Sequence, residues 1–300
     1  IRAYRLPPTA YRRASLRIFQ TRACPGGANF HDGSVLSAPR CLSLCLLCVP
    51  LAALSAGEPA AFKSLANLRT QEVLKALPNG GDSRAERLAW AAAQLGDQPV
   101  TDGKLREAER VLTELAAGDD ALASEAAYLR ARLYQLHFAT PDNARAATLY
   151  RELAERWPHS HWAQLGLVKL ALMEMYLLPG TASEVDRIAA AERLLDRIED
   201  PLLRRDLQLQ IGMAGIALRA PIARYLPHLV AAARFGGING SAREDILVQI
   251  GVLSAKIGAW VQAREFFERY LEEFPRNGRA YAVRERLAAV QQELAKGGAR

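Results

Sequence analysis

The sequence predicts an all-α protein, and two observations carry this prediction. From residue 59 onward, apolar residues recur every three to four positions in one run after another, which is the period of an amphipathic helix. No window alternates apolar and polar residues over enough positions to indicate a strand. The chain has 300 residues, of which 50% are apolar and 24% are charged, as in ordinary globular proteins.

The predicted helices follow one another with short breaks, which favours antiparallel neighbours. A leading helix is predicted over residues 59–77, and the run from Pro78 to Asp82 ends it and supplies a cap for the next helix. The remaining helices are predicted over residues 83–95, 104–117, 121–138, 143–157, 160–177, 182–199, 202–219, 221–234, 241–257, 259–274 and 278–296.

The last of these helices is predicted to close the array. Its apolar residues Leu287 and Val290 are expected to face inward, whereas Arg284, Glu285 and Gln292 are expected to face water.

The most informative window covers residues 244–277. Gly251 would let a neighbouring helix approach closely, and Gly258 would end the first helix without a Cβ penalty. Ala263 falls where the two helices would cross, and Phe267 would fill the gap between one pair and the next. Pro275 would stop the second helix. Together these residues predict one complete helix–turn–helix unit.

The spacing of these five residues resembles the 34-residue tetratricopeptide repeat (TPR) family. Residues 127–160 resemble it more loosely, through Leu133, Ala146, Tyr150 and Pro158. A third unit opens at Trp162, Leu165 and Gly166, and residues 202–234 keep an Ile211–Gly212 pair. The aromatic–proline endings of residues 150–158 and 267–275 look like those of bacterial envelope TPR proteins of the outer-membrane assembly and Tol–Pal type.

This resemblance implies a right-handed superhelical solenoid of antiparallel helix pairs over residues 83–296, which would bind another protein or a peptide rather than catalyse a reaction. In the family, the first helices of successive repeats line a concave groove. The positions that the resemblance places there are Tyr128, Gln135, Phe138, Ser160, Leu167, Leu170, Asp245, Val248, Val252 and Lys256. Their largely apolar character favours an extended peptide or a partner helix.

The formal net charge of +7 is concentrated at the N-terminus. Residues 1–40 hold seven arginines and one acid, a net charge of +6, and residues 41–56 carry no charge. The remainder has 39 − 7 = 32 basic and 32 − 1 = 31 acidic residues, a net charge of +1. Because no basic stripe remains in the body of the chain, nucleic acid is not the expected partner.

The N-terminal region is interpreted as a targeting segment. An apolar run over residues 41–54 follows Arg40 and precedes small residues, in the order of a secretory signal. We expect a signal peptide over residues 35–56, with cleavage after Ser55 or Ala56, and therefore an exported, periplasmic protein without a stable membrane span. Residues 1–34 would be a non-native or disordered extension, with an organelle transit peptide as the alternative. Residues 57–82 would form the leading helix and a linker, and residues 297–300 a tail.

Signals of catalysis or of cofactor binding are missing from the sequence. The four cysteines, Cys24, Cys41, Cys45 and Cys48, all precede residue 57 and lack partner ligands downstream. No nucleophile elbow, zinc-binding helix, phosphate loop or dinucleotide fingerprint follows them. We therefore expect no enzyme, no cofactor and no metal.

The remaining polar clusters have structural interpretations. The Gly-rich stretch over residues 235–241 is interpreted as a helix C-cap and loop, with Gly240 or Ser241 capping the next helix. The pair His159 and His161 would form a surface turn, His228 would pack at a helix interface, and the pair Asp119–Asp120 would cap a helix.

Three functions remain open on the sequence. An exported protein-binding scaffold is favoured over a helical arm or accessory subunit of an envelope cell-wall enzyme, and over a cytoplasmic regulatory TPR protein.

Overall fold

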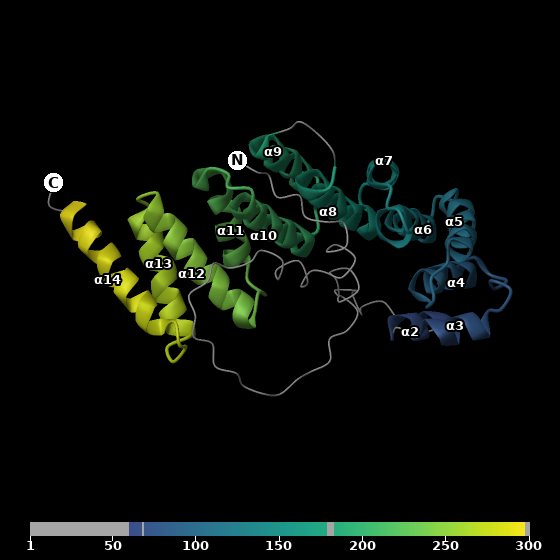
Figure 1. Cartoon of the computed structure of the whole chain (residues 1–300), viewed down its shortest axis with the longest axis horizontal. Helices are drawn as coiled ribbons and strands as arrows, with labels where there is room; N and C mark the ends of the chain where they lie inside the picture. The colour runs from purple at the N-terminus through teal and green to yellow at the C-terminus, as the bar shows by residue number, and fades with distance from the viewer. Residues whose placement is uncertain (1–59, 68, 179–182, 298–300) are drawn as a thin grey trace. The chain divides into compact units, whose positions relative to one another are not determined.

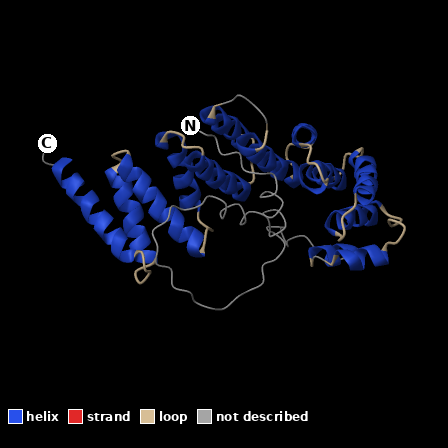
Figure 2. Ribbon diagram, in the orientation of Figure 1, coloured by secondary structure: helices blue, strands red, loops and turns tan. Residues whose placement is uncertain are grey.

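A computed structural model describes residues 60–67, 69–178 and 183–297. Within these ranges the chain forms thirteen α-helices and one π-helical turn, and no strand, so the all-α prediction is confirmed (Figure 2). The predictions for the extension over residues 1–34, for the signal peptide over residues 35–56 and for the four cysteines lie outside the described residues.

The helices follow the predicted order (Figure 1). They are α2 (Ala60–Ala66), α3 (Thr70–Ala76), α4 (Arg84–Gly96), α5 (Asp102–Ala116), α6 (Ala121–Arg132), α7 (Asn143–Arg156), α8 (His161–Tyr176), α9 (Glu184–Leu195), α10 (Pro201–Ala217), α11 (Ile222–Phe235), α12 (Gly240–Lys256), α13 (Trp260–Glu273) and α14 (Ala280–Gly297). The π-helical turn, Leu133–His137, continues α6.

Two predicted helices are divided. The leading helix ends at Ala66 and resumes at Thr70, because the N–H of Arg69 donates to the Ser64 carbonyl at 2.8 Å and closes the end of α2. The helix predicted over residues 121–138 changes to the π-helical turn after Arg132. There the N–H of Phe138 donates to the carbonyl of Leu133, five residues back, at 3.3 Å.

Side-chain caps fix several helix starts. Ser83 forms a capping box with Glu86 at the start of α4, so the cap is not supplied by the preceding Pro78–Asp82 run. Asp120 accepts from the N–H of Ala123 at 2.9 Å and caps α6, as predicted.

The Gly-rich stretch confirms one prediction and contradicts another. Gly236, with φ of +88°, is the C-cap of α11, a conformation that glycine adopts without strain. The N-cap of α12 is Asn239, without a side-chain hydrogen bond, so the prediction of a cap at Gly240 or Ser241 is wrong. Both residues instead lie in the first turn of the helix.

Helices that follow one another in the sequence pack against one another, from α2–α3 to α13–α14. Further contacts join helices two places apart, namely α2–α4, α4–α6, α6–α8 and α8–α10. Within the described part of the chain, extensive contacts do not reach beyond the second neighbour. In the described ranges, each helix therefore packs mainly on its neighbours in the sequence.

The predicted unit over residues 244–277 is the pair α12–α13. Gly251 lies against the ring of Phe267, and a Cβ added at Gly251 would fall 2.5 Å from Cε1 of that ring. Gly258 has φ of +75° in the turn, and Ala263 is fully buried. Phe267 is 1% exposed, but its ring fills the space within its own pair, whereas the sequence predicted the space between pairs. Helix α13 ends at Glu273, before Pro275.

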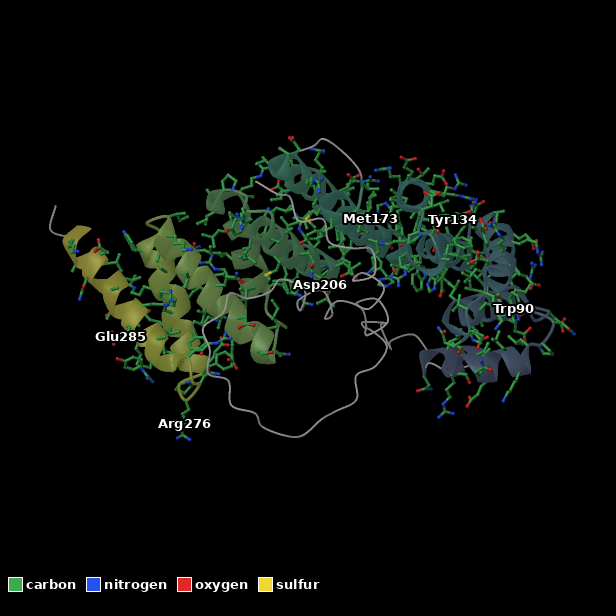
Figure 3. The ribbon with its side chains drawn as sticks, viewed as in Figure 1. Trp90, Tyr134, Met173, Asp206, Arg276 and Glu285 are labelled. Atoms are coloured by element: carbon green, nitrogen blue, oxygen red, sulfur yellow. The ribbon has the colours of Figure 1, made fainter. Side chains whose placement is uncertain are left out.

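Helix α14 closes the array with the predicted orientation. Val290 is buried, Leu287 is half-buried, and Arg284, Glu285 and Gln292 are exposed. Figure 3 labels Glu285 on this helix. No helix in the described ranges is both long enough and apolar enough to cross a membrane.

Candidate functional site

Four of the predicted groove residues are buried, and their assignment to an open groove requires correction. Leu167 and Leu170 on α8 pack in the core, each 1% exposed. On α6 and its π-helical continuation, the Tyr128 ring lies 5.2 Å from the Trp162 ring, and Gln135 accepts a hydrogen bond from the Tyr150 hydroxyl at 2.9 Å. The cause is the direct contact of α6 with α8 and of α8 with α10, which covers this part of the predicted face.

Two other predicted residues at the N-terminal end of this region have local roles. Ser160 caps α8 by accepting from the N–H of Ala163 at 3.1 Å. Phe138 is half-buried after the π-helical turn, where its ring lies 5.3 Å from the Tyr134 ring and beneath the Arg106 guanidinium at 5.7 Å. A cation above an aromatic ring is stabilising, so part of the Phe138 ring is engaged by intramolecular partners.

The predicted residues on α12 remain at the surface. Asp245, Val248, Val252 and Lys256 are spaced three to four residues apart and therefore share one face of this helix. Val248 and Val252 are half-buried, and Asp245 and Lys256 are exposed. Asp245 forms an ion pair with Arg279, which precedes α14. Of the groove that the sequence implied, this is the segment that a partner could reach.

Helix α10 carries an equivalent face that the sequence analysis missed. Helices α10 and α12 each span 17 residues, and their bounds differ by 39 positions. Residues 204–212 read RRDLQLQIG and residues 243–251 read REDILVQIG. At this shift, the half-buried residues Leu209, Met213 and Ile216 of α10 correspond to Val248, Val252 and Ala255 of α12. The six residues define what we call the apolar stripe.

The match between α10 and α12 also includes an arginine near the start of each helix and the backbone conformation of the turn that follows each helix. Arg204 donates to the Ile198 carbonyl at 3.2 Å, and Arg243 donates to the Ala233 carbonyl at 2.8 Å. Each arginine thus ties the start of its helix to the segment before it. Arg219, with φ of +56°, occupies the turn position that Gly258 occupies after α12, at φ of +75°. A search at a shift of 39 rather than 34 residues would have found this match.

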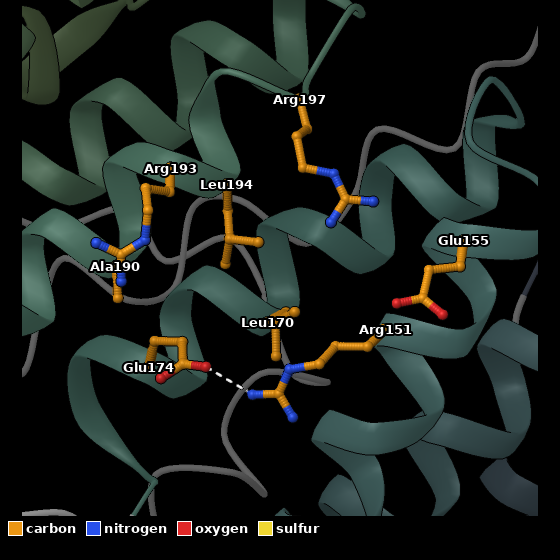
Figure 4. Close-up of a pocket in the computed structure, with 8 residues that line it drawn as sticks. All are labelled: Arg151, Glu155, Leu170, Glu174, Ala190, Arg193, Leu194 and Arg197. Atoms are coloured by element: carbon orange, nitrogen blue, oxygen red, sulfur yellow. Dashed lines mark hydrogen bonds and ion pairs between the residues drawn. The ribbon is translucent and has the colours of Figure 1, made fainter.

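A small hollow of about 170 Å³ lies among α7, α8 and α9 (Figure 4). Leu170, Ala190 and Leu194 contribute apolar lining, and five charged side chains complete it: Arg151, Glu155, Glu174, Arg193 and Arg197. Arg151 points toward Glu174 and donates to it at 2.7 Å, and Arg197 donates to the Ala154 carbonyl at 3.4 Å. One arginine of the lining is thus paired with a carboxylate, and another is bound to the backbone.

Three of the described histidines have local surroundings that the structure defines. Burial, followed by the nearby Arg132, lowers the pKa of His137 to about 4, while a hydrogen bond to the Leu95 backbone acts in the opposite direction. His228 lies at a helix interface, as predicted, with Nε2 3.1 Å from a carboxylate oxygen of Glu192. His159 is an exposed surface residue beside Glu199. The described residues contain no group of three or more histidine, cysteine or acidic side chains that could hold a metal ion.

Comparisons of the chain with protein-family models, with curated proteins and with solved structures find no match.

Proposed function

We propose that this chain is a non-enzymatic scaffold of the TPR type, whose helix pairs form a right-handed superhelical solenoid and bind a protein or peptide partner. The fold supports the proposal through its local pairs, since stacked repeats contact only their near neighbours. The pair α12–α13 adds the close approach of Gly251 to Phe267 and the turn glycine at residue 258.

The apolar stripe is the observation that carries the binding proposal. Helices α10 and α12 present half-buried apolar side chains at corresponding positions, although the side chains themselves differ. Extensive contact joins α8 to α10, but no comparable contact joins α10 to α12 in the described ranges. Apolar side chains left partly open on two repeated helices are suited to take a partner's apolar side chains by helix-in-groove or extended-peptide recognition.

A pull-down from the native host with Met213→Asp and Val252→Asp variants tests this site. Each change places a charge in the stripe, and burying an unpaired charge against apolar side chains is costly. We expect both variants to lose the partner that the unchanged chain recovers. Val261→Asp is the matched control, because Val261 lies on α13 and is 63% exposed. Circular dichroism establishes that all three variants remain folded.

Two results would contradict the proposal. Unchanged recovery by folded Met213→Asp and Val252→Asp variants would move the binding surface elsewhere. Phe138→Asp tests, in the same assay, the half-buried predicted residue that follows the π-helical turn. Recovery of a cell-wall enzyme would favour the accessory-subunit alternative instead.

We further propose that the chain is exported to the periplasm. The apolar run over residues 41–54, with Arg40 before it and small residues after it, supports this proposal. The intact mass of the protein isolated from its native host tests it. A mass that corresponds to a start at residue 56 or 57 is expected, and a mass that retains the apolar run would contradict export by signal cleavage.

A further inference from the structure

Two helix faces that are partly or fully open to solvent lie on α12 and α14, at the C-terminal end of the described helices. On α12, Val248, Val252, Ala255 and Lys256 lie on one face. On α14, Ala282, Arg286 and Ala289 recur at the same helical spacing, and all three are exposed. We call the set Val248, Val252, Ala255, Lys256, Ala282, Arg286 and Ala289 the α12–α14 face.

Polar contacts join the start of α12 to the segment that precedes α14. Asp245, one turn before Val248, forms an ion pair with Arg279, one turn before Ala282. Beside it, Asn277 Nδ2 donates to Glu244 Oε2 at 2.7 Å. Both α12 and α14 pack on α13 through short connections, so both run antiparallel to α13.

Counted from this ion pair, Arg286 lies as far along α14 as Val252 lies along α12. Val252 lies seven residues beyond Asp245, and Arg286 lies seven residues beyond Arg279. At about 1.5 Å per residue, both side chains begin about 10 Å from the ion pair. Lys256 follows one turn further along α12. The α12–α14 face therefore has an apolar middle, small alanines at one side and two cations.

Neither of these two cations has an acidic residue one helical turn away in the direction considered. The positions three and four residues away from Arg286 on its helix are Ala282, Val283, Ala289 and Val290, and none of the corresponding helical positions before Lys256 is acidic. Neither Lys256 nor Arg286 belongs to an ion pair in the described part of the chain. Other cations of this region do have carboxylate partners, since Arg243 and Arg269 both bind Glu273.

We propose that the α12–α14 face binds an amphipathic helix of another protein that carries acidic side chains along the edge of its apolar stripe. The apolar contact rests on the proposed function, whereas the acidic character of the partner rests on Lys256 and Arg286. Val248 and Val252 would take the partner's apolar side chains. Ala282 and Ala289 are small enough for a third helix to approach to the 8–10 Å that is usual for packed helices.

Two synthetic amphipathic helices test the proposal. They share one leucine face and differ only in the residues beside it, which are glutamate in one peptide and lysine in the other. We measure fluorescence anisotropy with the full chain and expect about tenfold tighter binding of the glutamate peptide, from two solvent-exposed ion pairs. The preference should shrink at about 1 M salt, where the Debye length falls to about 3 Å.

Charge-reversal variants test whether the preference for the glutamate peptide comes from this face or from the net charge of the whole chain. Lys256→Glu with Arg286→Glu should reverse the preference toward the lysine peptide. Lys75→Glu with Arg193→Glu changes the net charge equally on α3 and α9 and should leave the preference unchanged. Val252→Asp should weaken the binding of both peptides.

Each remaining outcome has a definite meaning. Equal binding of both peptides, abolished by Val252→Asp, would overturn the acidic partner and leave the apolar stripe as the site. Binding of neither peptide, or binding unaffected by Val252→Asp, would overturn both proposals for this face. Self-association of the chain that competes with the peptides would identify a second copy as the occupant and overturn a partner of another kind.

Discussion

Truncation of Phe267 tests the central packing contact of the α12–α13 pair. The side chain is 1% exposed and fills the space opposite Gly251. Phe267→Ala removes roughly 100–150 Å² of buried apolar surface, which corresponds to about 3 kcal/mol at about 25 cal/mol per Å². The cavity left behind brings the expected loss of unfolding free energy to about 3–5 kcal/mol. Gly251 has no side chain with which to refill the space.

Urea denaturation followed by far-UV circular dichroism measures this loss. Phe235→Ala is the matched control, because Phe235 is 51% exposed at the end of α11. The Arg205 guanidinium lies over its ring. We expect the control to lose less than about 1 kcal/mol. Equal midpoints for the two variants would show that Phe267 is not packed, and the register of the whole repeat would then be wrong.

Two further predictions concern stability. Gly251→Leu should destabilise the chain by about 1–3 kcal/mol or more, because its side chain would enter the ring of Phe267. Gly103→Ala should be neutral or slightly stabilising in the same denaturation assay, since a Cβ there meets nothing within 4 Å. The third prediction concerns pH. With its pKa lowered to about 4 by burial and by Arg132, His137 binds a proton more weakly in the folded than in the unfolded chain. Its contribution, up to about 3 kcal/mol, should be fully present above pH 6.5 and be lost as pH falls toward 4. A His137→Gln variant with the same pH dependence of stability between pH 7 and 5 would contradict this assignment.

The helix order could be predicted because its causes are local. Ser160 and Asp120 precede periodic apolar runs and cap the helices that follow, so both starts are visible in the sequence. The turn at Gly258 is equally local, since φ of +75° suits glycine. The residues of the capping box, Ser83 and Glu86, were visible in the sequence as well. The cap was nevertheless predicted in the glycine-rich run that ends at Asp82, one residue before Ser83.

The exposure of the site residues could not be predicted, because it depends on helices that are distant in the sequence. Tyr128 faces Trp162 across the contact between α6 and α8, and no pattern within α6 indicates that contact. The π-helical turn after Arg132 could not be predicted either, because the apolar residues there continue the period of an α-helix without a break. The match between α10 and α12 was visible in the sequence, but at a spacing other than that of the family.

The contrast between α8 and α12 explains where a partner can bind. Residues 167–171 of α8 are buried in succession, because α7 and α9 cover this helix together with α6 and α10. Helix α12 contacts α11 and α13 extensively, but neither α10 nor α14 covers it to the same extent in the described ranges. Leu167 directly follows Gly166, and Val252 directly follows Gly251. Leu167 is nevertheless buried in the core, whereas Val252 is half-buried at the surface. A charge at Leu167 should therefore abolish binding only by unfolding the chain, whereas a charge at Val252 should abolish it in a folded protein.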